Sequence, residues 1–241
     1  MENAHRDELV LSYTRVRTAL GILGMFLPVV LILGGMLDTP RLGASAGEIE
    51  PTISDFYHTT YRDIFVGTLC AIGIFLISYR GYRREENEVI DDDLLANLAG
   101  LAALGVAFFP NDGGDGTIVS MSQGVTGVEI AKMLHYASAL VFFTCLAAFC
   151  FFKFARTNDV KRRKIYIACG WTIVGALVAT AIAVIFKQHI PGVGRELVKE
   201  WKLIFWFEAV GIWAFSLSWL VKGKADLALA NLVTHKKPPA Q

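Results

Sequence analysis

The sequence predicts an all-α membrane protein: one domain, residues 1–241, that forms a bundle of six transmembrane helices. Apolar residues make up 54% of the chain and charged residues only 19%, whereas a soluble domain carries roughly 25% charge. The charges also avoid six long stretches that together hold nearly half of the chain. This composition excludes a soluble enzyme, a disordered protein and a small secreted domain held together by disulfides.

Each of these stretches predicts one membrane span, because a helix of about 20 apolar residues crosses the hydrocarbon core of a bilayer. The two shortest stretches are extended by flanking tyrosines, Pro110 and neutral residues. The last stretch differs from the others because it contains one charge, Glu208. The predicted spans cover approximately residues 18–37, 62–80, 94–111, 130–152, 165–186 and 203–221.

The distribution of basic residues predicts the orientation of the bundle. The N-terminal tail, the second and fourth loops and the C-terminal tail carry more than two-thirds of the 23 Lys and Arg residues. Such segments stay on the cytoplasmic side, so both termini are expected in the cytoplasm. A multi-pass chain with a retained first helix is typical of a bacterial inner membrane. The net charge of +1 gives no reason to expect a nucleic-acid partner.

Two features of the sequence predict how the helices end and pack. Apolar residues recur at helical spacing from Val193 to Trp201, with charged residues between them, which predicts a short interfacial helix before the last span. Small residues within the spans predict close contact between helices. These are Gly100, Gly105, Gly170 and Gly175.

Several ionisable residues are predicted to gather at the outer side of the bundle. Ionisable groups in or near hydrocarbon are costly and face the bundle interior or a wet cavity. Glu208 has no charged neighbour one turn away on its own helix. Its carboxylate must therefore find a partner elsewhere, for which His135 and Arg62 are the candidates, take up a proton, or reach water. The other outer-side residues of this group are Ser54, Asp55, His58 and Asp63.

Two interpretations of these outer residues compete. In one, His58, His135 and Glu208 bind a divalent metal such as zinc, which activates water against a lipid ester or amide. In the other, the same groups form a hydrogen-bonded network that locks the helix ends. The second is favoured because no His-x-x-x-His or His-Glu-x-x-His spacing is present. Haem ligation by His135 has no supporting motif either.

Four segments carry a resemblance to a known family. They are Pro51-Thr-Ile-Ser-Asp55 followed by Ile64-Phe65, Asn97-Leu-Ala-Gly-Leu running to Phe109, His135-x-x-x-Ala139 followed by Phe142-Phe143, and Glu208 in an aromatic last span. In order and spacing they resemble the Frag–DRAM–Sfk group of six-helix membrane proteins and its bacterial relatives of unknown function. The departure is Phe56-Tyr57-His58, which replaces small and proline-rich residues.

The resemblance implies a lipid-related role, such as glycolipid-anchor remodelling, regulation of phospholipid asymmetry or membrane-degradation signalling. It also implies that the site is formed by Ser54, Asp55, His135 and Glu208. The favoured hypothesis is a non-enzymatic or regulatory protein that binds a membrane lipid in an outward-facing polar pocket. The alternatives are a metal-dependent hydrolase or acyl-transfer enzyme acting on lipid, and a small proton-coupled transporter in which Glu208 binds the proton. Assembly into a homo-oligomer or with another membrane protein is left open.

Overall fold

The computed structural model describes residues 2–37, 49–79, 91–111 and 120–223, with the side chains of the first helix described from Thr14 onward. Within these ranges every regular element is a helix, and there is no strand. The elements are α1 (Glu2–Leu37), η1 (Ser54–His58), α2 (Arg62–Ile77), α3 (Asp92–Phe108), α4 (Met121–Thr126), α5 (Val128–Ala148), η2 (Phe149–Phe154), α6 (Val160–His189), α7 (Val193–Glu200) and α8 (Leu203–Lys222). The prediction of an all-α fold is confirmed.

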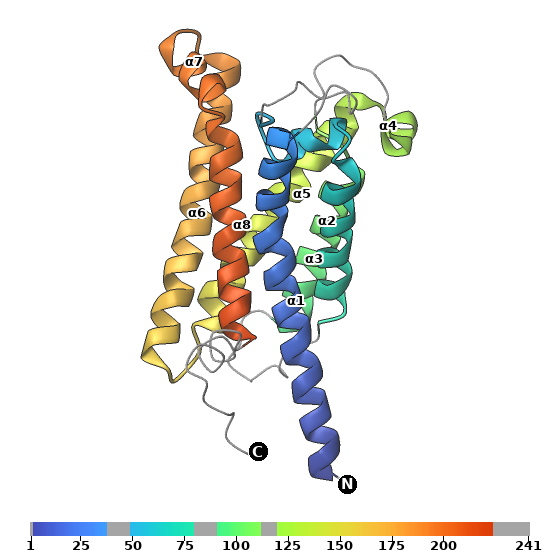
Figure 1. Ribbon diagram of the computed structural model, residues 1–241, viewed down its shortest axis with the longest axis vertical. Helices are drawn as coiled ribbons and strands as arrows, with labels where there is room; N and C mark the ends of the chain where they lie inside the picture. Colours follow the sequence, from blue (N-terminus) through green and yellow to red (C-terminus); the bar gives the residue numbers. More distant parts are fainter. Residues whose placement is uncertain (1, 38–48, 80–90, 112–119, 224–241) are drawn as a thin grey trace.

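Six long helices form a closed ring in the order α1, α2, α3, α5, α6 and α8, with α8 packed against α1. Figure 1 shows α6, α7 and α8 standing together on one side of α1, α2 and α3. The Trp213 indole N–H donates to the carbonyl oxygen of Met25 across the α1–α8 interface, at 3.2 Å. Thr18 lies beside Gly223, so the first turns of the span in α1 and the end of α8 lie at the same end of the bundle.

Four helical segments are long and apolar enough to cross a membrane: Thr14–Leu37, Val128–Phe154, Val160–His189 and Leu203–Lys222. These four segments confirm the prediction of a membrane protein with several transmembrane helices. With 16 and 17 residues, α2 and α3 rise only about 24 and 26 Å, less than the roughly 30 Å of a hydrocarbon core. The count of six crossings therefore remains a prediction. Residues 224–241, whose cytoplasmic placement was predicted, lie outside the described residues.

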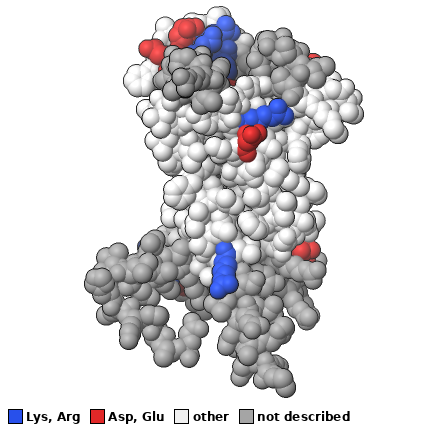
Figure 2. Space-filling view, turned by 45° about the vertical axis from the view of Figure 1, so that its right-hand side comes forward, with Lys and Arg blue, Asp and Glu red and all other residues white. Residues whose placement is uncertain are grey.

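The outer surface of the bundle is apolar. Phe26, Leu101, Met133 and Trp171 are each more than half exposed, at 57%, 61%, 63% and 63%. On the face shown in Figure 2, a wide uncharged band separates charged residues near the two ends. Exposed apolar area on this scale indicates contact with lipid rather than water.

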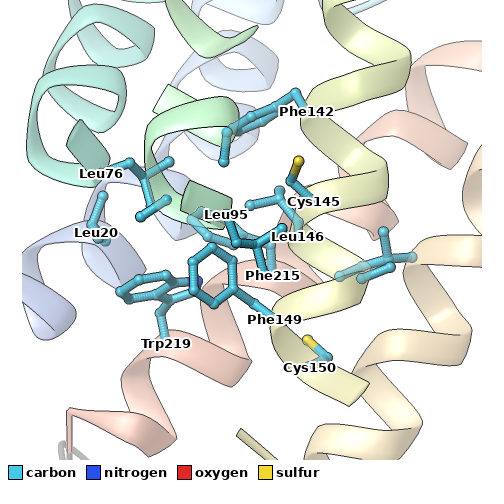
Figure 3. Packing of buried hydrophobic residues seen from close by; sticks show 14 of the residues in the cluster. Leu20, Leu76, Leu95, Phe142, Cys145, Leu146, Phe149, Cys150, Phe215 and Trp219 are labelled. Atoms are coloured by element: carbon cyan, nitrogen blue, oxygen red, sulfur yellow. The ribbon is translucent and has the colours of Figure 1, made fainter. Parts of the chain in front are cut away.

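The two ends of the bundle are named here after their landmarks. The η1 end holds Ser54–His58 and the beginnings of α5 and α8. The Trp219 end holds Trp219, η2 and the beginnings of α3 and α6. There, side chains from different helices project toward one another (Figure 3), including Leu20 from α1, Leu76 from α2 and Phe215 from α8. This cluster is the larger of the hydrophobic cores.

Close helix packing occurs at three of the four glycines for which it was predicted. A Cβ atom on Gly100 would lie 2.6 Å from the carbonyl oxygen of Gly73 on α2, so α2 and α3 approach to backbone contact there. Gly105 and Gly170 also lie directly against side chains of neighbouring helices. The prediction is wrong for Gly175, because a Cβ atom there would meet nothing within 4 Å.

The short helix before the last span is confirmed as α7. Its Val198 side chain is 8% exposed and packs against Ile204 and Ala183, whereas Val193 is 77% exposed. Lys202 adopts the left-handed conformation, with φ of 49°, at the corner between α7 and α8. This corner turns the chain back into the bundle at the η1 end.

Candidate functional site

Residues 51–58, called here the strap, close part of the η1 end. The backbone N–H of Phe205, in the first turn of α8, donates to the carbonyl oxygen of Pro51 at 3.1 Å. The first N–H groups of a helix have no partner within the helix, so the strap supplies one. The apolar side chains of Ile53, Phe56 and Tyr57 are buried beneath it. The strap is therefore a packed part of the bundle.

Glu208 anchors the strap from inside the last span. Its carboxylate Oε2 accepts the backbone N–H of Ile53 at 2.7 Å. The sequence predicted a side-chain partner, His135 or Arg62, but the hydrogen bond goes to a backbone amide. Arg62 instead lies over the Tyr57 ring, 4.2 Å from its centroid, and donates to its hydroxyl at 2.7 Å. Backbone amides give no signal in a sequence pattern, which is why this partner was missed.

His135 joins the strap to α5 and to the end of α3. The ring is only 1% exposed. Its Nδ1 lies 2.6 Å from the carbonyl oxygen of Phe109, and its Nε2 lies 2.9 Å from Ser54 Oγ. A carbonyl oxygen can only accept a hydrogen bond, so Nδ1 carries the hydrogen. In the neutral imidazole, Nε2 then accepts the hydrogen bond from the Ser54 hydroxyl.

Asn111 forms a second bridge between the strap and the end of α3. Its side-chain nitrogen donates to Asp55 Oδ1, and its oxygen accepts from Nε2 of His58 at 3.1 Å. The Asn111 side chain is buried, at 4% exposed. Together with the bonds of Glu208 and His135, these contacts form a hydrogen-bonded network across the helix ends.

The predicted zinc site does not form. Within the described ranges, no group of three or more His, Cys, Asp and Glu side chains is placed to hold a metal ion. The three predicted ligands turn to different partners: His58 to Asn111, His135 to Ser54 and Phe109, and Glu208 to Ile53. The three side chains are thus directed at separate partners rather than at a shared point.

A cavity of about 700 Å³ lies beside the network, between α5, α6, α8 and the strap. Its end nearest the strap is polar. The polar residues lining that end are Thr52, Ser54, Asp55, Asn111, His135, Lys187, Gln188, Lys199 and Glu208.

The rest of the cavity is apolar and runs toward the middle of the bundle. One face of α5 lines it with Ala139, Leu140 and Phe143, and one face of α6 lines it from Ala176 onward. Phe143 and Ala176 meet at Gly211, where a Cβ atom would lie 3.1 and 3.4 Å from them, so the cavity ends there. From Ala176 to Gln188, α6 rises about 18 Å, which sets the depth of the cavity.

The cavity opens sideways between α5 and α6. Tyr136, Leu140 and Ile185 line it and yet are 47%, 55% and 50% exposed. Toward the Trp219 end the two helices close together again, with the Phe151 and Trp171 rings 5.3 Å apart. The opening therefore lies between two helices that are long and apolar enough to cross a membrane.

Four of the seven predicted site residues line this cavity: Ser54, Asp55, His135 and Glu208. The other three, His58, Arg62 and Asp63, lie outside its lining, and Asp63 is exposed at the start of α2. Prediction from the sequence did not assign Asn111, Lys187, Gln188 and Lys199 to the site. Lys187 and Gln188 follow the fifth predicted span directly and Lys199 lies on the predicted interfacial helix, which was the available signal.

The fold and the cavity together define a helical membrane protein with a pocket that is polar at one end and apolar along its length. The chain matches no protein-family model, and it matches neither a curated protein nor a solved structure. The resemblance to the Frag–DRAM–Sfk group therefore stays a prediction.

Proposed function

We propose that this protein binds one membrane lipid in the cavity, with the lipid headgroup beside the strap and an acyl chain between α5 and α6. The observation that carries the proposal is the division of the cavity into a polar end and an apolar length. Its volume of about 700 Å³ falls within the range of small-molecule pockets, about 300–1,000 Å³. The sideways opening gives a lipid a route that does not require it to leave the membrane.

The charges at the polar end favour a phospholipid. Lys187 and Lys199 line that end beside the carboxylates of Asp55 and Glu208. Lys187 also interacts electrostatically with Glu208, and the two ammonium groups supply the positive charge that a phosphate requires. Charge-assisted hydrogen bonds of this kind are about twice as strong as neutral ones.

We further propose that all six ring helices cross the membrane, with the η1 end outward and the chain ends in the cytoplasm. The ring order supports this, because α2 and α3 lie between α1 and α5, two helices that are apolar and long enough to span. Short helices are accommodated by local thinning of the bilayer. The excess of Lys and Arg in the predicted inner segments supports the orientation, and we propose a bacterial inner membrane as the location.

A bulky side chain placed in the cavity tests lipid binding. Ala181 lines the cavity on α6, and Ala181→Trp is expected to fill the acyl channel. We expect the phospholipid retained by the purified chain, measured by extraction and mass spectrometry, to fall at least about tenfold. Loss of about 1.4 kcal/mol of binding free energy produces that change.

The matched control is Leu101→Trp, because Leu101 lies on the exposed outer face of α3 and outside the cavity lining. We expect this variant to retain as much lipid as the wild type. Equal retention by the wild type and both variants contradicts binding in the cavity.

A further inference from the structure

We propose that Ser54 and His135 form a nucleophile and general-base pair that removes an acyl group from an ester lipid in the cavity. This inference rests on the proposed lipid binding, since the cavity must first present the ester to the pair. It differs from the metal-dependent hydrolase considered from the sequence, because it needs no metal and uses a serine in place of His58.

The first argument is the geometry of the pair. Ser54 Oγ lies 2.9 Å from Nε2 of His135, within the reach that a serine and its base require, about 2.6–3.2 Å. A third group must hold the base in the correct tautomer. Here the Phe109 carbonyl oxygen takes the Nδ1 hydrogen at 2.6 Å, which leaves the Nε2 lone pair directed at the Ser54 hydroxyl.

The second argument is that Thr52 rather than Ser54 caps the first turn of η1. A serine at the start of a helix normally caps the backbone N–H groups of the first turn. In the strap Thr52 fills that role, because its Oγ1 accepts the backbone N–H of Asp55 at 3.0 Å. The Ser54 side chain is thereby left directed at His135.

The third argument is access. Both residues line the cavity, but Ser54 is only half-buried whereas His135 is 1% exposed. The nucleophile is thus on the cavity side and the base is shielded behind it. Donors to stabilise a developing negative charge line the same polar end: the Asn111 amide and the ammonium groups of Lys187 and Lys199. Stabilisation of that charge is commonly the largest single contribution to acyl transfer.

The chemical step balances with water as the only co-reactant. Ser54 Oγ forms a bond to the ester carbonyl carbon while its proton passes to Nε2 of His135. The bond from that carbon to the lipid alkoxide then breaks, and His135 returns the proton to the alkoxide. Water, deprotonated by the same nitrogen, then attacks the acyl-serine. The bond from the acyl carbon to Ser54 Oγ breaks, His135 returns the proton to Oγ, and a fatty acid is released. An alcohol in place of that water gives acyl transfer.

A long-chain alkyl fluorophosphonate tests the pair on the full-length chain in detergent micelles. The probe phosphonylates an activated serine with loss of fluoride, and peptide mass spectrometry identifies the serine. We expect the adduct on Ser54 of the wild type and none in Ser54→Ala. In His135→Asn the amide still donates to the Phe109 carbonyl but the base is gone, so labelling is expected to slow by about 10²–10⁴-fold.

The control is Ser122→Ala, because Ser122 Oγ donates to the Phe108 carbonyl oxygen and has no histidine partner. Labelling of Ser54 is expected to be unchanged in this variant. The labelled serine of the wild type is identified in the wild type alone, so this result does not depend on whether any variant folds. A wild type that retains lipid but carries no adduct on Ser54 overturns the acyl transfer and leaves lipid binding standing. A wild type labelled on Ser54 that retains no lipid overturns the proposed function alone.

Discussion

The two ends of the bundle bury their polar groups in different ways. At the Trp219 end, Lys153 and Asp92 form an ion pair at 2.7 Å with side chains 5% and 7% exposed, and Arg17 donates to the Tyr79 hydroxyl at 2.8 Å. Both of these contacts join side chain to side chain. At the η1 end, side chains also meet side chains, as in Asn111–Asp55, but Glu208 in addition binds the backbone of the strap and His135 binds the backbone beyond α3. A hydrogen bond to such a backbone group fixes the position of a connecting segment, whereas a bond between side chains of two helices joins two helix faces.

The density of side-chain packing also differs between the two ends. Around Trp219, the rings of Phe154, Tyr79 and Phe149 lie with centroids 5.1, 5.3 and 5.5 Å from the indole. At the η1 end, the space between α5 and α6 is a cavity. The Trp219 end is therefore tightly packed, whereas the η1 end leaves a cavity beside its hydrogen-bonded network.

The largest expected effect is at the Trp219 end. Lys153→Ala removes the ion-pair partner at 2.7 Å from the buried Asp92 carboxylate, so we expect the free energy of unfolding to fall by up to about 3–5 kcal/mol. Thermal unfolding of the purified chain in one detergent, followed by circular dichroism, measures the change.

The matched control is Lys132→Ala, because Lys132 also pairs at 2.7 Å, with a Glu129 side chain that is 82% exposed. An exposed pair contributes at most about 1 kcal/mol. Similar losses in both variants contradict the assignment of the Trp219 end as the more stabilising one.

The next effect concerns the strap. Glu208→Ala removes the acceptor of the buried Ile53 amide, so we expect a loss of about 1–3 kcal/mol in unfolding free energy. The strap itself is the sharper readout: hydrogen exchange of the Ile53 amide is expected to accelerate in this variant. Glu208→Gln keeps an acceptor oxygen and should lose less. Equal exchange in Glu208→Ala and the wild type contradicts the role of Glu208 as the anchor of the strap.

Much of the helical fold could be predicted from the sequence, because long hydrophobic stretches report directly on helices that can cross a bilayer. The helix before the last span and the special status of Glu208 were predicted in the same way. Ser54, Asp55 and His135 were also predicted, because orientation and resemblance both placed them at one face.

The contacts of these residues could not be predicted. The partner of Glu208 is the Ile53 amide, and that of His135 Nδ1 is the Phe109 carbonyl oxygen; every residue except proline carries both groups, so no residue type marks them. The cavity arises from the divergence of α5 and α6, which depends on packing at distant positions such as Phe151 and Trp171. The buried Lys153–Asp92 pair was missed because Lys153 looked like one of many cytoplasmic basic residues.

A smaller effect separates a tightly packed position of the ring from an exposed one. Gly100→Ala forces a methyl group against the backbone of α2, so we expect a loss of at least about 1 kcal/mol from overpacking. Gly175→Ala, on α6, enters open space and gains helix propensity, up to about 1 kcal/mol. Opposite shifts of the melting temperature are therefore expected. A shift of the same sign in both variants contradicts the difference in packing between α3 and α6.

The smallest effect tests backbone strain at the η1 end. In the described residues, all three positive φ angles belong to connections at that end: Gly127, Gly192 and Lys202. A residue with a side chain loses roughly 1–2 kcal/mol of stability in the left-handed region, and replacement by glycine removes this cost. Part of the gain is cancelled because glycine also gives the unfolded chain more conformational freedom. Lys202→Gly is therefore expected to raise the unfolding free energy by up to about 1 kcal/mol. The control is Lys164→Gly within α6, where the same replacement should lower the unfolding free energy by about 1 kcal/mol.

Because Lys202 joins α7 to α8, a stabilised corner should also slow the hydrogen exchange of the Phe205 amide, which donates to the strap at Pro51. A drop in stability for Lys202→Gly as large as that for Lys164→Gly would mean that this corner stores no strain and that the η1 end is held as rigidly as the Trp219 end.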